Sequence, residues 1–220
     1  MIGVCDSGEG GRIAVEELRA LAPMADVCFL ADRENAPYGT KSPLELLSLL
    51  RADIRRVRDA GADEVLIACC TASTVYDRLT PDERHGVYPI ITPTARAAAA
   101  ATKSGRIGVL ATEATVASHA FRKAVGSILP GARVTEIAAQ RFVDYVERGR
   151  VNRDDVKRTV EKFYKENIDT LILGCTHFPR LSGIISEYAV GITLVSSALE
   201  GAHEIVRHAC LSGSGATIFL

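Results

Sequence analysis

Two cysteines, Cys69 and Cys175, each end a short apolar run of the kind that forms a buried parallel strand. Small polar residues follow closely, among them Thr71 in the first case and Thr176 in the second. In α/β sheets, ligands bind outside the carboxyl ends of the strands. Two thiols that face one substrate from opposite sides can remove a proton from one face and return a proton to the other. That is the chemistry that inverts a stereocentre.

A thiol acts as a base only in its thiolate form. The pKa of a free cysteine is about 8.5, and a helix N-terminus or a nearby cation lowers it. Both Cys69 and Cys175 precede a predicted turn or helix start, where backbone N–H groups stabilise an anion. The alternative for each residue is a buried structural cysteine, which is the commoner use of this residue type.

A glycine-rich segment, Asp-Ser-Gly-Glu-Gly-Gly, runs from Asp6 to Gly11 between a predicted strand and a predicted helix. Its glycines allow a tight turn and a close approach of the backbone to a ligand. The segment does not fit the dinucleotide pattern G-x-G-x-x-G, and its leading acid would repel a phosphate. Asp6 therefore suits a substrate ammonium group or a proton relay, and helix capping is the alternative.

The composition predicts an ordinary globular core. The chain has 220 residues, is 47% hydrophobic and carries a formal net charge of -1. This balance gives no support for a nucleic-acid partner. No apolar stretch approaches the roughly 20 residues of a membrane span, and the N-terminus lacks the charged region of a signal peptide. We therefore expect a cytoplasmic protein with neither a nucleic-acid partner nor a membrane partner.

The six cysteines are expected to be reduced, because disulfides are rare in cytosolic proteins that have their own core. A metal site is not expected. The chain has no Cys-x-x-Cys pair and no histidine pair at ligand spacing near a cysteine.

Predicted strands and helices alternate along the chain, which favours an α/β fold with mainly parallel sheets. The predicted strands cover residues 2–5, 27–30, 63–69, 87–92, 106–110 and 169–175. Helices are predicted at residues 12–21 and 42–61, and two more are predicted to begin at about residue 73 and at residues 152–155.

The pattern restarts in the middle of the chain. Residues 106–110 echo residues 1–5 at an offset of 105, and the two cysteine runs match at an offset of 106. This repetition predicts two similar, pseudo-symmetric α/β lobes with an active site in the cleft between them. We predict a first lobe of residues 1–93 plus 196–220 and a second lobe of residues 94–195, because domain ends often lie close together.

Six short segments carry motifs whose order is more specific than any one of them. They are Asp-Ser-Gly-x-Gly-Gly at 6–11, Pro-Tyr-Gly-Thr-Lys-Ser at 37–42, Ala-Cys-Cys-Thr-Ala-Ser at 68–73, Val-Leu-Ala-Thr-x-x-Thr at 109–115, Val-Glu-x-Gly at 146–149 and Leu-Gly-Cys-Thr-His-Phe-Pro at 173–179. In this order they resemble the cofactor-independent aspartate/glutamate racemase family, and most closely its glutamate racemases.

The resemblance implies a two-lobed fold with Cys69 and Cys175 as catalytic residues, assisted by Asp6, Glu147 and His177. It implies substrate contacts from Asp6, Ser7, Tyr38, Gly39, Thr71, Thr115, Thr176 and His177. Members of the family use neither pyridoxal phosphate nor a metal, and a homodimer is a family expectation. Taken alone, Tyr38 is a turn residue, Glu147 is a solvated helix charge, and His177 suits packing as well as function.

Cys70 is the main departure from the family pattern. An offset of 105 aligns Cys70 with Cys175, whereas an offset of 106 aligns Cys69 with Cys175, and the family pattern agrees with the second. Position 70 is normally an asparagine that holds the substrate, and a thiol lacks the paired donor and acceptor of an amide. We predict an enzyme that interconverts L- and D-glutamate for cell-wall synthesis. An aspartate racemase and a non-catalytic amino-acid-binding paralogue stay open as alternatives.

Overall fold

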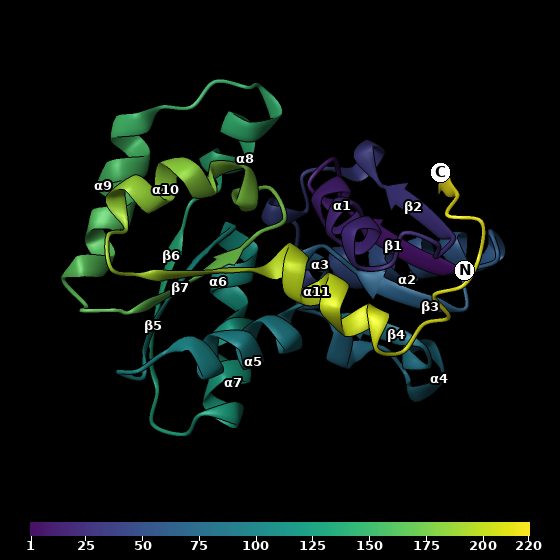
Figure 1. Ribbon diagram of the computed structural model, residues 1–220, viewed down its shortest axis with the longest axis horizontal. Helices are drawn as coiled ribbons and strands as arrows, with labels where there is room; N and C mark the ends of the chain where they lie inside the picture. Colours follow the sequence, from purple (N-terminus) through teal and green to yellow (C-terminus); the bar gives the residue numbers. More distant parts are fainter.

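The computed structural model describes residues 1–220, which form two parallel β-sheets flanked by helices (Figure 1). The strands are β1 Ile2–Asp6, β2 Val27–Ala31, β3 Glu64–Ile67, β4 Val87–Pro89, β5 Arg106–Ala111, β6 Arg133–Ala138, β7 Thr170–Gly174, β8 Thr193–Ser196 and β9 Thr217–Phe219. Their order is β4-β3-β1-β2-β9 in the first sheet and β6-β5-β7-β8 in the second, with parallel pairing throughout. The predicted α/β fold is confirmed.

The α-helices are α1 Gly11–Leu21, α2 Pro43–Asp59, α3 Cys70–Ser73, α4 Pro81–Arg84, α5 Ile91–Ala101, α6 Glu113–Ser118, α7 Ala120–Ile128, α8 Arg141–Glu147, α9 Arg153–Tyr164, α10 Ser182–Tyr188 and α11 Ser197–Val206. Four short 3₁₀ helices are η1 Arg33–Asn35, η2 Tyr38–Thr40, η3 Tyr76–Arg78 and η4 Phe178–Leu181. No helix is both long enough and apolar enough to cross a membrane. The first lobe is the five-stranded sheet with the helices that pack on it, and the second lobe is the four-stranded sheet with its helices.

The two sheets repeat the same register. In the first sheet Ile2 of β1 lies opposite Glu64 of β3, and in the second Ile107 of β5 lies opposite Thr170 of β7. The β1–β5 offset is therefore 105 residues and the β3–β7 offset is 106. At the second offset Cys69 is the counterpart of Cys175, so the register favours Cys69 over Cys70 as its equivalent.

The chain crosses between the lobes twice. The first crossing follows β4, and residues 92–94 lie in the first turn of α5. After β8 the chain returns, because α11 packs beside α1 and β9 pairs with β2 (Figure 1). The Asp26 carboxylate fixes this return by accepting backbone hydrogen bonds from Ser214 and Ala216. The predicted division at residues 93 and 196 stays a prediction.

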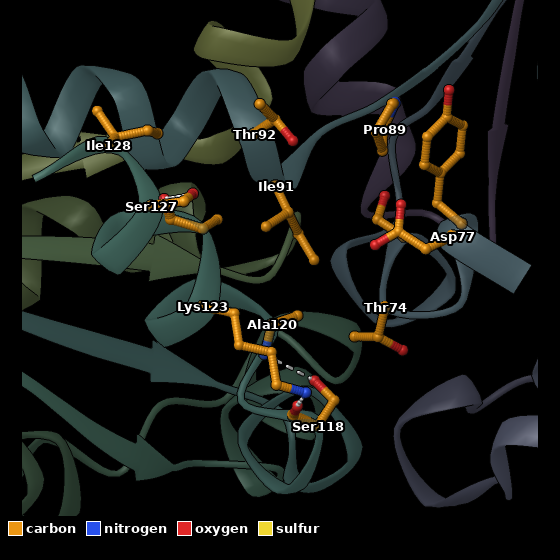
Figure 2. Close-up of a pocket in the computed structure, with 13 residues that line it drawn as sticks. Thr74, Asp77, Pro89, Ile91, Thr92, Ser118, Ala120, Lys123, Ser127 and Ile128 are labelled. Carbon is orange, nitrogen blue, oxygen red and sulfur yellow. Dashed lines mark hydrogen bonds between the residues drawn. The ribbon is translucent and has the colours of Figure 1, made fainter. Parts of the chain in front are cut away.

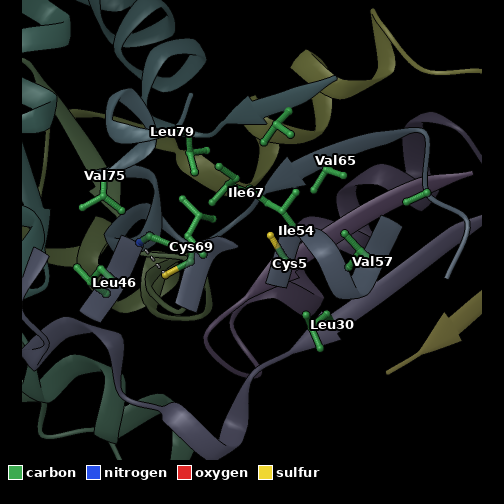
Figure 3. Packing of buried hydrophobic residues seen from close by; sticks show 14 of the residues in the cluster. Cys5, Leu30, Leu46, Ile54, Val57, Val65, Ile67, Cys69, Val75 and Leu79 are labelled. Carbon is green, nitrogen blue, oxygen red and sulfur yellow. Dashed lines mark hydrogen bonds between the residues drawn. The ribbon is translucent and has the colours of Figure 1, made fainter. Parts of the chain in front are cut away.

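An aliphatic core lies between α2 and the first sheet (Figure 3). Leu46, Leu50 and Val57 of α2 are buried there against Cys5 and Ile67. Such residues recur every three or four positions, which is the pattern of a helix that buries one face. The same cluster includes Cys69, so the core of the first lobe extends to the sheet edge that carries the thiol.

The start of α2 agrees with its sequence signal. Ser42 Oγ accepts from the Glu45 N–H at 3.3 Å, and the Glu45 carboxylate accepts from the Ser42 N–H at 2.9 Å. Pro43 follows as the first helical residue. This reciprocal capping box satisfies two N–H groups that a helix start leaves without partners.

Two predicted elements were wrong in extent. The helix expected from about Ser73 is instead α3, which ends there, followed by η3 and α4. Pro81 cannot continue a preceding helix, and Thr80 caps a new one by accepting from the Glu83 N–H at 3.3 Å. The strand expected at residues 87–92 stops at Pro89, because α5 begins at Ile91.

Candidate active site

Cys69 lies two residues beyond the end of β3 and caps the N-terminus of α3. Its Sγ accepts from the Ala72 N–H at 3.4 Å, and its thiol donates to Ser7 Oγ at 3.6 Å. The residue is only 5% exposed. Burial raises the pKa of Cys69 to about 12, and the nearby Asp6 carboxylate adds to the rise, whereas the Ala72 N–H opposes it. In this buried position Cys69 is therefore a neutral thiol at neutral pH.

Cys175 occupies the equivalent position after β7 and is 6% exposed. Its Sγ lies 3.7 Å from His177 Nδ1. Burial raises the pKa of Cys175 well above its ordinary value, and Cys70, Cys69 and Asp6 add to this electrostatically. Both predicted catalytic thiols are therefore buried groups that share one electrostatic environment.

His177 connects Cys175 to a carboxylate at the protein surface. Its Nε2 lies 2.5 Å from Glu147 Oε1, at the end of α8. The His177 side chain is buried, whereas the Glu147 side chain is 42% exposed. A cavity of about 240 Å³ opens beside this pair, and Gly10 and Arg180 are among its lining residues. Cys175, His177 and Glu147 thus form a line of proton-carrying groups from the buried thiol to solvent.

Asp6 joins the two lobes. At the end of β1 its carboxylate accepts from the Gly8 N–H at 2.9 Å and from the second-lobe Thr176 hydroxyl at 2.9 Å. Burial raises the pKa of Asp6, while His177 opposes the rise. The first residue before α1 is Gly10 and no side chain caps that helix, so the helix-capping alternative for Asp6 is wrong.

Gly10 explains why the turn after β1 is rich in glycine. A Cβ at this position would lie 2.6 Å from both His177 Nδ1 and Thr176 Oγ1. Real Cβ atoms do not approach other atoms so closely, so only glycine lets the first-lobe turn contact these second-lobe residues. The glycine thus permits close contact between protein groups across the cleft.

Three buried threonine hydroxyls form a triangle across the same cleft. Thr71 of the first lobe lies 2.9 Å from Thr112 and 3.1 Å from Thr115, which are 2.8 Å apart in the second lobe. The sequence prediction included Thr71 and Thr115 but missed Thr112 as a site residue. The sequence feature that could have indicated Thr112 is its position just before α6, where its hydroxyl caps the helix by accepting from the Thr115 N–H.

The Tyr38 hydroxyl forms hydrogen bonds with carboxylates and not with the thiols. Its hydroxyl contacts Asp32 at 2.6 Å and Asp53 at 2.8 Å, two buried first-lobe carboxylates that the sequence prediction did not include. The side-chain hydroxyl is thus already hydrogen-bonded within the first lobe, and the substrate contact of Tyr38 stays a prediction. The adjacent Gly39 lies against the side chain of Gln140, a second-lobe residue that was also missed.

Cys70 faces the interface between the lobes. It belongs to an apolar cluster with Ile90, Ile91 and Val109, which are buried residues. Burial raises the pKa of the Cys70 thiol far above its ordinary value, and a hydrogen bond with Ser197 opposes the rise. The structure thus brings Cys70 near Cys175 without giving it the hydrogen-bonding capacity of an amide.

Another cavity, of about 340 Å³, lies at the junction of α5, α7 and the segment after α3 (Figure 2). Asp77, Ile91 and Lys123 are among its lining residues, and the Lys123 ammonium donates to the Ser118 carbonyl at 3.0 Å. None of the predicted site residues lines it. No group of three histidine, cysteine or carboxylate side chains is arranged to hold a metal ion.

Comparison with known proteins identifies the family. The model of the Asp/Glu/Hydantoin racemase family matches residues 14–205. The chain is 39% identical over 214 residues to the glutamate racemase of Mycobacterium tuberculosis. The aligned region covers 94% of this chain and 78% of that protein.

Solved structures agree in fold. A glutamate racemase isoform from Bacillus anthracis superposes with a TM-score of 0.89 at 31% identity, covering 100% of this chain and 86% of that one. The glutamate racemase of Francisella tularensis, solved in complex with D-glutamate, gives a TM-score of 0.88 at 25% identity, covering 99% and 86%. On these matches, and on the two-lobed fold with its paired strand-end cysteines, the chain belongs to the Asp/Glu/Hydantoin racemase family.

Proposed function

We propose that this protein interconverts L- and D-glutamate without a cofactor, using Cys69 and Cys175 as the two bases. The observation that carries the proposal is the equivalent position of the two thiols. Each lies one residue or two beyond its strand, at matched register in the two sheets. The similarity to glutamate racemases over 94% of the chain supports the same assignment.

The reaction needs one thiolate and one thiol. The thiolate of one cysteine takes the α-proton and becomes a thiol, and the electron pair left on the α-carbon is delocalised into the substrate carboxylate. The other thiol then gives its proton to the opposite face and becomes the thiolate. Reversing the roles of Cys69 and Cys175 runs the reaction in the other direction, so the enzyme is restored after both half-reactions.

Substrate charge offsets the effect of burial on the thiols. Burial holds the pKa of Cys69 and of Cys175 above the ordinary value, so the free protein contains few thiolates. A substrate ammonium group in the cleft favours a nearby anion and lowers these pKa values. The Asp6 carboxylate acts electrostatically on Cys69, and His177 with Glu147 serves Cys175, so each base has a helper.

The remaining polar groups suit the two carboxylates of glutamate. Hydroxyls of Ser7, Thr71, Thr115 and Thr176 and the backbone of Tyr38 and Gly39 supply the contacts that the family resemblance implies. Hydroxyl and backbone N–H groups are effective donors to carboxylates in a water-poor site. Cys70 cannot supply the amide of the family pattern, and this single difference keeps aspartate as the second candidate substrate.

Three further assignments accompany the proposal. The lobes divide at residues 93 and 196, with residues 196–220 belonging to the first. D-Glutamate is made for the bacterial cell wall, in the cytoplasm. A homodimer is expected from the family. These assignments draw on the family and on the return of α11 and β9 to the first lobe.

The test is proton NMR of each enantiomer of glutamate and of aspartate in D₂O. We expect loss of the α-proton signal with both enantiomers of glutamate. Cys69→Ser and Cys175→Ser should abolish racemisation, and each should leave solvent exchange with only the enantiomer whose α-proton faces the remaining thiol. Full-rate racemisation by Cys69→Ser would refute the two-thiol assignment. Exchange with aspartate alone would identify aspartate as the substrate, and no exchange with either amino acid would indicate a non-catalytic paralogue.

A further inference from the structure

A single hydroxyl joins two buried carboxylates in the first lobe. Tyr38 Oη lies 2.6 Å from Asp32 Oδ2 and 2.8 Å from Asp53 Oδ2. Tyr38 is 1% exposed, and both aspartates are 3% exposed. A phenol carries one proton and can donate to only one of the two carboxylates. The second short contact therefore requires a proton on a carboxyl group.

The surroundings identify which carboxyl carries it. Asp32 accepts from Asn35 Nδ2 at 3.0 and 2.9 Å, and the Arg56 guanidinium lies 4.0 Å away. These groups stabilise an ionised Asp32. Asp53 has the Tyr38 hydroxyl as its only side-chain hydrogen-bond partner. The proton consequently belongs to Asp53, which donates to Tyr38 Oη while Tyr38 donates to Asp32.

Most other charged groups around Asp53 also disfavour its ionised form. Burial raises the pKa of Asp53 to about 7, and the nearby Asp32 and Asp6 carboxylates add to the rise, whereas the contact with the Tyr38 hydroxyl and the Arg56 guanidinium oppose it. The Cys5 thiol of β1 also faces Asp53, and burial and Asp53 both raise its pKa. Apart from Arg56, no cation offsets the cost of a second buried negative charge here.

The hydrogen bonds among Asp32, Tyr38 and Asp53 hold a turn that reaches the other lobe. Tyr38 and Gly39 belong to η2, which packs against α6 of the second lobe. Gly39 approaches the Gln140 side chain so closely that a Cβ there would clash. Movement of the Tyr38 side chain would therefore shift a part of the first lobe that borders the cleft.

We propose that Asp53 is a positioning residue that acts as a neutral carboxylic acid, holding the Tyr38–Gly39 turn in the geometry that binds substrate. As regards substrate, this inference rests on the proposed function. When Asp53 loses its proton, two carboxylates compete for one hydroxyl proton, and the turn loses its anchor. Substrate affinity then falls on the alkaline side, independently of the thiols.

The same titration affects stability. The folded-state pKa of Asp53 lies above the ordinary value for an unfolded chain, so the native state holds the extra proton. The stability contributed by this proton is fully present below the ordinary aspartate pKa of about 4 and is lost as pH rises from there to about 7. The melting temperature should decline over that range even in the absence of substrate.

Asp53→Asn is the decisive variant, because an amide can donate to Tyr38 Oη but cannot ionise. For the unmodified protein we expect KM to rise by up to about tenfold per pH unit above the titration, with a smaller change in kcat. In Asp53→Asn this rise should disappear, and the fall in melting temperature between about pH 4 and 7 should flatten. Asp59→Asn, at an exposed position of α2, is the control and should behave as the unmodified protein.

The melting profile needs no substrate, so it separates this inference from the proposed function. Flattening in Asp53→Asn alone supports the inference even if no racemase activity is found. Equal profiles in the unmodified protein and Asp53→Asn would overturn it. If the variant does not fold, ¹³C NMR titration of the aspartate carboxyls decides. One buried carboxyl with a midpoint near 7 is expected, and a midpoint below about 5 for every aspartate would overturn the inference.

Discussion

The hydroxyl of Thr176, the residue after Cys175, donates a 2.9 Å hydrogen bond to the carboxylate of Asp6, which ends β1 in the other lobe. Both groups are buried, so the contact is shielded from water. It joins the lobes at a place where Cys69 and Cys175 are both nearly buried. The same two side chains are predicted to bind substrate, so this bond links two predicted substrate contacts across the lobes.

Gly10→Ala should damage activity more than stability. The added methyl would lie 2.6 Å from His177 Nδ1 and from Thr176 Oγ1, and must push the lobes apart or turn the imidazole away from Cys175. We expect a loss of about 100-fold in racemisation, because misplacement by about 1 Å has that effect on reacting groups. Gly8→Ala is the matched control in the same turn, since its Cβ would meet nothing within 4 Å. Equal rates in the two variants would contradict the close-contact role of Gly10.

Glu147→Gln tests the line of groups behind Cys175. The neutral amide cannot stabilise a charged imidazolium at His177, whose Nε2 lies 2.5 Å from the carboxylate. Racemisation should fall about 100-fold, the lower end of what positioned acid–base groups contribute. The folded state should be little affected, because Glu147 is 42% exposed. Glu166→Gln, an exposed glutamate without a side-chain partner, should match the unmodified protein; a comparable loss there would remove the support for a relay.

Alkylation rates report the thiol environments directly. Hydrogen bonds from Ser212 lower the pKa of the exposed Cys210, whereas burial raises the pKa of Cys69 to about 12. At a given pH Cys210 therefore has the larger thiolate fraction, and iodoacetamide should label it first. The thiolate fraction of Cys69 should grow about tenfold per pH unit across the neutral range. Mass spectrometry of timed samples measures both rates, and Cys210→Ser should remove only the fast reaction.

Ser42→Ala should lower stability without a direct effect on chemistry. It removes the acceptor of the Glu45 N–H and half of the capping box at the start of α2. The expected cost is about 1 kcal/mol, or about 2–4 °C in melting temperature for a chain of this size. Ser48→Ala lies in the exposed middle of the same helix and should not lower the melting temperature. Equal melting temperatures for the two variants would show that the box contributes little.

Much of the fold could be predicted because its signals are local. The runs that end at Cys69 and Cys175 are apolar from Val65 and from Leu171 onward, as buried parallel strands require, and the start of α2 has a cap and a proline at fixed spacing. The strand β6 was missed because it is an edge strand with polar residues such as Arg133 and Glu136 and no buried member. Its position is set by the strand beside it.

The site was predictable where one motif holds the chemistry and less so where distant residues meet. His177 and Cys175 are neighbours in the chain, so the motif contains both. Asp53 reaches Tyr38 only after α2 has packed on the first sheet. Its one local signal was a charged residue on the buried stripe that includes Leu50 and Val57. Gln140 gave no such signal, because its contact with Gly39 depends on how the two lobes face each other.

The return of β9 to the first sheet also sets the order in which the molecule can assemble. All strands of the second sheet come from residues 106–196, whereas the edge of the first sheet closes only when Asp26 meets Ala216 across 190 residues of chain. Contacts between distant residues form slowly, because loop closure must be completed before any bond repays it. During synthesis the second lobe can therefore fold on the ribosome from consecutive residues. In the first lobe the edge of β2 stays unpaired until β9 is made, and an unpaired strand edge favours aggregation.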